Sequence, residues 1–210
     1  MEFEIVKFLL IPLQFLSGSV MYSYILAKIA AVDLRNVRDG NPGSSNLWRV
    51  KGWKWGFTSL ALDYFKGVYP LAFFVWHKDI ATNPFIIATA ALSGILGHAF
   101  SPFLKFKGGK AIATTFGAWS VLTRWEAPML LGTVFTIFSI YNKLRRIKET
   151  TPEDDAVRVF FGFAVLFVYT LWKAFNGRLE LLILYFGNLA VVLYKHKREL
   201  INITQRRYAE

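Results

Sequence analysis

The chain has 210 residues, 54% of them hydrophobic, and carries 25 Lys and Arg against 14 Asp and Glu. Apolar runs of about 20 residues alternate with short polar stretches, a pattern that excludes a soluble domain and is typical of a polytopic membrane protein. The absence of cysteine excludes disulfides and thiolate catalysis, and three widely separated histidines give no metal-binding pattern. We therefore expect neither a metal nor another cofactor.

Seven apolar segments are long enough, or nearly so, to form membrane-spanning helices. They are Ile5–Ile29, Trp55–Trp76, Phe85–Leu104, Ala111–Thr123, Ala127–Tyr141, Val157–Lys173 and Leu179–Tyr194. The first lacks a preceding basic region and a following cleavage site, so we expect a retained helix rather than a signal peptide. No internal repeat is visible, which predicts a single all-α domain over residues 1–210 with about seven transmembrane helices.

The distribution of positive charge predicts the orientation of these helices, because Lys and Arg accumulate in cytoplasmic loops. With the N-terminus outside, nineteen basic residues fall in the cytoplasmic loops and the C-terminal tail, and five fall on the other side. This indicates an outside N-terminus and a cytoplasmic C-terminus. Since the charge follows the loops, it favours anionic lipids and ligands over nucleic acid as partners.

Asp63 and Lys66 lie one turn apart inside the second predicted helix. Ionisable groups at membrane depth must pair or line a wet cavity, so we expect them to pair and to point into the bundle. A structural ion pair and a direct role in ligand binding are both open.

The loop from Arg38 to Arg49 is dense in Gly, Ser and Asn. Such residues favour turns through local hydrogen bonds, so an ordinary loop is one interpretation. The other is an anion-binding nest, in which backbone amides, hydroxyls and Arg49 surround a phosphate.

The stretch from Gly97 to Thr114 places three lysines around Gly108-Gly109, where a helix is predicted to begin. The start of a helix favours anions, so Lys110 is expected to bind phosphate, whereas Lys105 and Lys107 are equally explained by topology. The P-loop spacing is absent. Of the histidines, we expect His98 to pack in the core, while His196 has an interfacial or a functional role. His77 lies beside Lys78 on the other side, where we expect no function.

Together these residues resemble the PlsY family, membrane enzymes that acylate glycerol 3-phosphate from an acyl phosphate. The match runs over most of the chain, and its most specific part is Gly97 to Thr114. It also includes Gly18-Ser19, Ala27-Lys28, residues 32–49, Leu62–Gly67 and Tyr194–Lys197.

The resemblance implies a multi-pass protein of the cell membrane with a cytoplasmic active site and no nucleophilic side chain. The protein would hold two phosphates, neutralise them and align the attack of a hydroxyl on an activated carbonyl, giving lysophosphatidic acid. The implied partners are acyl phosphate, glycerol 3-phosphate and membrane lipids, with no nucleic acid and no obligate protein partner. The implied catalytic residues are Arg49, Lys110 and His196. The implied substrate-binding residues are Ser19, Gly40, Asn41, Gly43, Ser45, Asn46, His98, Lys107, Gly108, Gly109, Thr114 and Glu199.

Several positions depart from the family pattern. Asp39 replaces a serine, Glu199 stands where an asparagine is expected, and acidic residues 153–155 replace a Ser-rich segment. Ala111 and Met21 replace a glycine and a proline. Asp39 should repel phosphate unless Arg38 or a lysine neutralises it.

These departures keep alternatives open. One is a divergent paralogue with a different acceptor or a non-catalytic lipid-binding role. A small anion transporter is disfavoured by the absence of an inverted repeat. If the acyltransferase site is intact, Ser45, Asn46, Arg49, Lys110 and His196 should converge on one cavity.

Overall fold

Helices account for every predicted apolar segment. The computed structural model describes residues 2–76, 83–147 and 149–209, and no strand occurs in this part of the chain. The α-helices are α1 (Glu2–Ser19), α2 (Tyr22–Ile29), α3 (Ser44–Lys51), α4 (Trp53–Val68), α5 (Leu71–Trp76), α6 (Pro84–Ala99), α7 (Ile112–Thr123), α8 (Glu126–Leu144), α9 (Pro152–Phe175), α10 (Glu180–Lys195) and α11 (Lys197–Ala209). Two 3₁₀ helices, η1 (Leu34–Asn36) and η2 (Pro102–Leu104), lie between them.

The two short segments predicted as separate helices are indeed separate. Arg124 and Trp125 both take positive φ values, 48° and 76°, which end α7 and reorient the chain before α8. Three stretches of the described chain are long and apolar enough to cross a membrane, Phe8–Ile29, Pro84–Leu104 and Pro152–Phe175. The number of helices that cross the membrane, and their orientation, stay predictions.

The first two predicted segments are broken, and two further helices were not predicted. Pro70 lacks an N–H and forces Tyr69 into an extended conformation, which separates α4 from α5. The first segment breaks between Ser19 and Tyr22, where the Val20 carbonyl accepts a hydrogen bond of 2.5 Å from Lys66 Nζ. The unpredicted helices α3 and α11 are short on apolar residues, so hydropathy did not reveal them.

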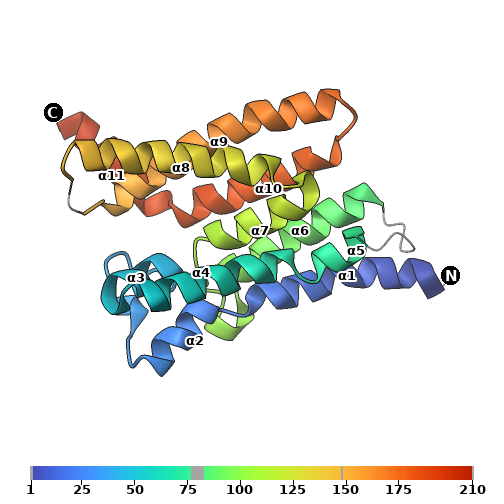
Figure 1. Ribbon diagram of the computed structural model, residues 1–210, viewed down its shortest axis with the longest axis horizontal. Helices are drawn as coiled ribbons and strands as arrows, with labels where there is room; N and C mark the ends of the chain where they lie inside the picture. Colours follow the sequence, from blue (N-terminus) through green and yellow to red (C-terminus); the bar gives the residue numbers. More distant parts are fainter. Residues whose placement is uncertain (1, 77–82, 148, 210) are drawn as a thin grey trace.

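Glycines allow the helices to approach closely, as is common in membrane proteins. A Cβ atom on Gly18 of α1 would overlap the Gly94 carbonyl of α6. Similarly, a Cβ on Gly117 of α7 would overlap the Tyr64 carbonyl of α4. Figure 1 shows α8, α9 and α10 covering the bundle formed by the earlier helices.

Asp63 and Lys66 form the expected ion pair inside the bundle. Their charged atoms lie 2.8 Å apart, and each side chain is only 2% exposed. The Ser23 hydroxyl of α2 donates a hydrogen bond to Asp63, and the Val20 carbonyl accepts one from Lys66. The pair thus links α4 to α2 and to the segment that connects α1 with α2.

The basic segments gather at one end of the bundle. Figure 1 shows α2, α3 and α11 at the same end as the connection between α8 and α9, whereas the N-terminus lies at the opposite end. This arrangement matches the set of loops predicted to be cytoplasmic. His77 and Lys78 lie outside the described residues.

We expect Gly18→Ala to destabilise the protein, because the added methyl group must push α1 away from α6. Overpacking of this kind costs about 1 to 3 kcal/mol. Thermal unfolding in detergent, followed by tryptophan fluorescence, measures the effect. Gly132→Ala is the matched control, since a Cβ there meets only Phe116, at 4.0 Å. Equal melting temperatures for the two variants would contradict the proposed close contact.

Candidate functional site

A cavity of about 100 Å³ opens at the basic end of the bundle. Four separate parts of the chain line it: residues 38–46, residues 110–113 at the start of α7, the first turns of α9, and His196 between α10 and α11. Asp63 and His98 contribute from α4 and α6. Segments more than 150 residues apart in the sequence therefore meet at one place.

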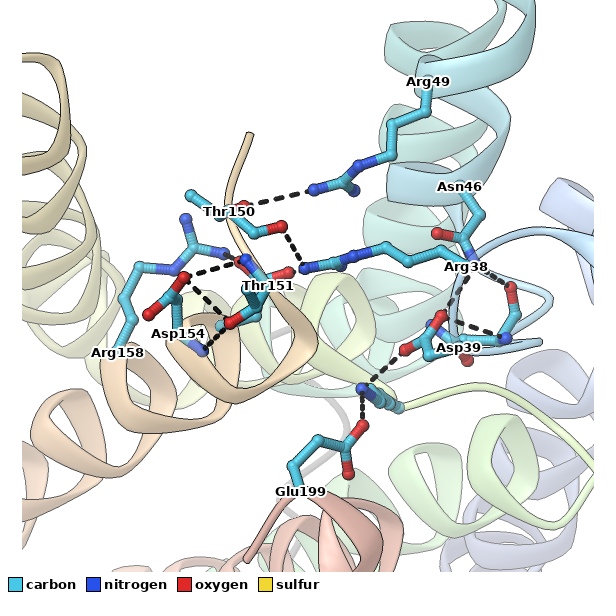
Figure 2. A network of polar contacts seen from close by, with 12 residues as sticks. Arg38, Asp39, Asn46, Arg49, Thr150, Thr151, Asp154, Arg158 and Glu199 are labelled. Carbon is cyan, nitrogen blue, oxygen red and sulfur yellow. Dashed lines mark hydrogen bonds and ion pairs between the residues drawn. The ribbon is translucent and has the colours of Figure 1, made fainter. Parts of the chain in front are cut away.

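Lys110 occupies the centre of this arrangement. Its ammonium group lies 2.7 Å from Asp39 Oδ2 and 2.6 Å from Glu199 Oε1. In Figure 2, Asp39 and Glu199 reach the same point from opposite sides. The expectation that a lysine or Arg38 neutralises Asp39 is met by Lys110, whereas Arg38 pairs elsewhere. Asp39 and Glu199, which both depart from the family pattern, thus bind the lysine expected to hold phosphate.

The Asp39 carboxylate is ionised at neutral pH. Burial raises its pKa, but hydrogen bonds from Lys110 and Asn46 outweigh burial and leave the pKa below its ordinary value. The ion pair with Lys110 is therefore present at neutral pH.

Asn46 organises the loop that carries Asp39. Its buried Nδ2 lies 2.8 Å from Asp39 Oδ1, 3.1 Å from the Val37 carbonyl and 3.0 Å from the Asn41 carbonyl. The adjacent Ser45 is exposed, and its side chain borders the cavity from the first turn of α3. Asn46 thus shapes the loop, while Ser45 is open to a ligand.

The Gly108-Gly109 segment packs directly on His98. A Cβ on Gly108 would overlap the His98 carbonyl, and one on Gly109 would overlap the imidazole ring. The Gly108 carbonyl accepts a hydrogen bond of 2.9 Å from Lys195 Nζ. Close packing therefore explains this glycine pair and fixes the position of Lys110.

His98 itself is buried, as expected for a packing residue. One of its ring nitrogens lies 3.2 Å from Thr114 Oγ1, which donates a hydrogen bond of 3.0 Å to the Asp63 carbonyl. Thr114 thereby joins α7 to α4 below the cavity.

Gly40 and Lys107 support the site through their backbones. Arg35 donates one hydrogen bond to the Gly40 carbonyl, at 3.3 Å, and another to the Lys107 carbonyl. Arg35 thus ties the loop containing Asp39 to the lysine-rich loop.

Eight of the fifteen expected site residues do not line the cavity: Arg49, Ser19, Gly40, Lys107, Gly108, Gly109, Thr114 and Glu199. Arg49 extends to the segment before α9, where it donates a hydrogen bond of 3.2 Å to Thr150 Oγ1. Figure 2 shows it pointing to Thr150 and away from Glu199. Ser19 is buried at the end of α1, and its hydroxyl donates a hydrogen bond to the Phe15 carbonyl one turn earlier. The expectation that Arg49 lines the same cavity as Lys110 and His196 is therefore wrong.

Arg49 instead lines a groove directly beside the cavity. The groove contains Thr150 and Glu149, and it shares four residues with the cavity: Ser44, Ser45, Asp155 and Arg158. Cavity and groove form a continuous polar region with a cation on each side.

His196 is buried at the end of α10, with Nδ1 3.0 Å from the Val192 carbonyl. Burial and the neighbouring Lys110 charge lower its pKa below the ordinary value. The ring is therefore neutral at neutral pH. The tautomer that donates from Nδ1 to Val192 leaves Nε2 as a hydrogen-bond acceptor.

Asp155 and Arg158 also belong to the site, although the sequence did not lead us to expect them there. Arg38 lies 2.6 Å from Asp155, and Arg158 lies 3.0 Å from the same carboxylate. Asp155 and Arg158 are three residues apart at the start of an apolar helix, the spacing that drew attention to Asp63 and Lys66. The same spacing could therefore have identified Asp155 and Arg158 as an ion pair from the sequence.

The fold and the site define a helical integral membrane protein with a polar, charged cavity at one end of an apolar bundle. The chain belongs to the glycerol-3-phosphate acyltransferase family, whose model matches residues 8–206.

Relatives match over nearly the whole chain. Glycerol-3-phosphate acyltransferase 1 of Thermotoga maritima is 68% identical over 194 residues, which cover 92% of this chain and 96% of the relative. The glycerol-3-phosphate acyltransferase of Endomicrobium trichonymphae is 31% identical, covering 96% and 94%.

A solved structure has the same fold. The crystal structure of PlsY (YgiH), an integral membrane glycerol 3-phosphate acyltransferase, in its glycerol 3-phosphate form, superposes with a TM-score of 0.74. Its sequence is 26% identical, and the match covers 96% of this chain and 94% of that one.

The lowered pKa of His196 predicts a pH dependence of stability. Unfolding restores the ordinary pKa near 6.5, so the unfolded chain binds the proton more strongly than the folded one. Stability should therefore fall as the pH drops below about 6.5 and continue to fall until the lower folded-state pKa is passed. We expect the melting temperature of the wild-type protein to decrease more between pH 7.5 and 5.5 than that of His196→Gln. Identical decreases would contradict the neutral, buried state of His196.

Proposed function

We propose that this protein transfers a fatty acyl group from an acyl phosphate to glycerol 3-phosphate, giving lysophosphatidic acid and inorganic phosphate in phospholipid synthesis. The reaction would take place on the cytoplasmic side of the cell membrane. The observation that carries the proposal is the position of Lys110, where three segments resembling the family meet around one ammonium group.

The chemistry requires positioning and charge more than a reactive side chain. A hydroxyl oxygen of glycerol 3-phosphate attacks the acyl carbonyl carbon, the bond from that carbon to the phosphate oxygen breaks, and the hydroxyl proton passes to a phosphate oxygen. Because the donor is already activated, holding the two phosphates together supplies most of the catalysis.

The polar region offers a place for each phosphate. Lys110, Ser45 and the neutral His196 would bind one phosphate in the cavity. Arg49 would bind the other in the adjoining groove, which shares Ser44 and Ser45 with the cavity. In this proposal Asn46, Gly43 and Asn41 shape the loop, while Gly108, Gly109 and Thr114 fix Lys110 from behind.

Substrate binding then involves an exchange of partners at Lys110. Two carboxylates now neutralise this ammonium group, so a phosphate must displace Glu199 or Asp39 from it. Displaced Glu199 would be free to accept a hydrogen bond from the glycerol hydroxyls.

The same pairing favours a second candidate, a paralogue whose acceptor is less negatively charged than glycerol 3-phosphate. Asp39 and Glu199 oppose a second anion in the cavity, and a neutral polyol acceptor would avoid this repulsion.

Release of inorganic phosphate from palmitoyl phosphate, measured with and without glycerol 3-phosphate, tests the proposal. We expect turnover that depends on glycerol 3-phosphate and that Lys110→Ala lowers by about a hundredfold or more, the scale of removing one transition-state contact. Lys143→Ala is the control, since Lys143 is exposed and lies outside the cavity and groove. Folded protein that turns over with glycerol but not with glycerol 3-phosphate would favour the paralogue.

A further inference from the structure

Arg158 borders both parts of the polar region. It lies in the second turn of α9 and lines the cavity that contains Lys110 as well as the groove that contains Arg49. A guanidinium group at this position adjoins both places where phosphates are proposed to bind.

The hydrogen-bonding capacity of Arg158 is only partly used. A guanidinium carries five N–H donors. Here Nη2 contacts Asp155 Oδ1 at 3.0 Å, and the guanidinium lies 4.9 Å from the centre of the Phe135 ring. Its Nε–H is buried and has no hydrogen-bond partner within the described part of the chain. A buried donor left unpaired is costly, so a ligand that accepts from it would be stabilised.

The other cations of the cavity are more fully paired. Lys110 has two carboxylate partners. Arg38 contacts Asp155 at 2.6 Å and donates a second hydrogen bond, of 2.7 Å, to the Thr150 carbonyl. Asp155 is thus shared between two guanidinium groups, and its single charge cannot neutralise both.

Arg158 also lies where the sequence departs from the family pattern. Acidic residues 153–155 stand where the resemblance leads us to expect a Ser-rich segment, and they add negative charge at the start of this helix. An arginine supplies donors in a planar fork that matches two oxygens of one phosphate.

On the basis of the proposed function, we propose that Arg158 binds a substrate phosphate directly. Arg38 then neutralises Asp155, which leaves the guanidinium of Arg158 free to turn its fork to the ligand.

The test compares Arg158→Gln, Arg158→Lys and the control Arg145→Gln in detergent-solubilised full-length protein. Arg145 is an exposed arginine at the same end of the molecule, bonded to the Tyr141 hydroxyl. Calorimetry measures the affinity of each protein for inorganic phosphate, and steady-state kinetics give KM for glycerol 3-phosphate and for palmitoyl phosphate.

We expect Arg158→Gln to weaken phosphate binding by about tenfold or more, the scale of one lost charge-assisted contact, and to raise KM for one substrate similarly. The substrate whose KM rises identifies the phosphate that is bound. Arg158→Lys should bind phosphate with an affinity between those of the wild type and Arg158→Gln, because lysine keeps the charge but loses the planar fork of donors. Arg145→Gln should match the wild-type protein.

The proposal is overturned if folded Arg158→Gln binds phosphate as the wild type does, or if the wild type binds none. Should Arg158→Gln fail to fold, Arg158→Lys decides, with unchanged affinity counting against the proposal. A wild type that binds phosphate but does not turn over palmitoyl phosphate with glycerol 3-phosphate refutes the proposed function alone, and the calorimetry still decides the role of Arg158.

Discussion

The ammonium group of Lys110 holds the polar end of the molecule together. It joins the loop carrying Asp39 to Glu199 of α11, two segments separated by most of the chain. Its own position depends on Gly108 and Gly109, which have no side chains and can therefore lie against His98. Removing either glycine would displace the lysine, and losing the lysine would leave two partly buried carboxylates without their cation. The site and the packing of α6 against the lysine-rich loop are thus parts of one arrangement.

The apolar bundle below the site follows a second constraint, that polar groups at depth must find partners inside the protein. Asp63 and Lys66 meet it by pairing with each other, and Lys66 also satisfies a carbonyl exposed by the break between α1 and α2. Asp63 borders the cavity as well. The buried pair thereby connects the helix packing to the floor of the polar region.

Hydropathy predicted the helical class and the positions of the apolar segments, because these depend on local composition. The Asp63–Lys66 pair was also predictable from spacing. Neither α3 nor α11 was visible, since both are polar helices that form by packing at the surface of the bundle. The direction of Arg49 could not be predicted either, because it depends on Thr150, a residue about one hundred positions away. The pairing of Lys110 with Asp39 and Glu199 could not be predicted either, because only the fold brings these three segments of the chain together.

If glycerol 3-phosphate binds in the cavity beside Lys110, it should protect a thiol introduced at the border of that cavity. The chain has no cysteine, so Ser45→Cys places a single exposed thiol at the border of the cavity, and Thr204→Cys places one on the exposed face of α11. The rate of modification by a charged thiol reagent is measured with and without glycerol 3-phosphate. We expect glycerol 3-phosphate to slow modification of Ser45→Cys and to leave Thr204→Cys unaffected. Equal rates with and without the ligand at Ser45→Cys, in protein that still turns over, would contradict it.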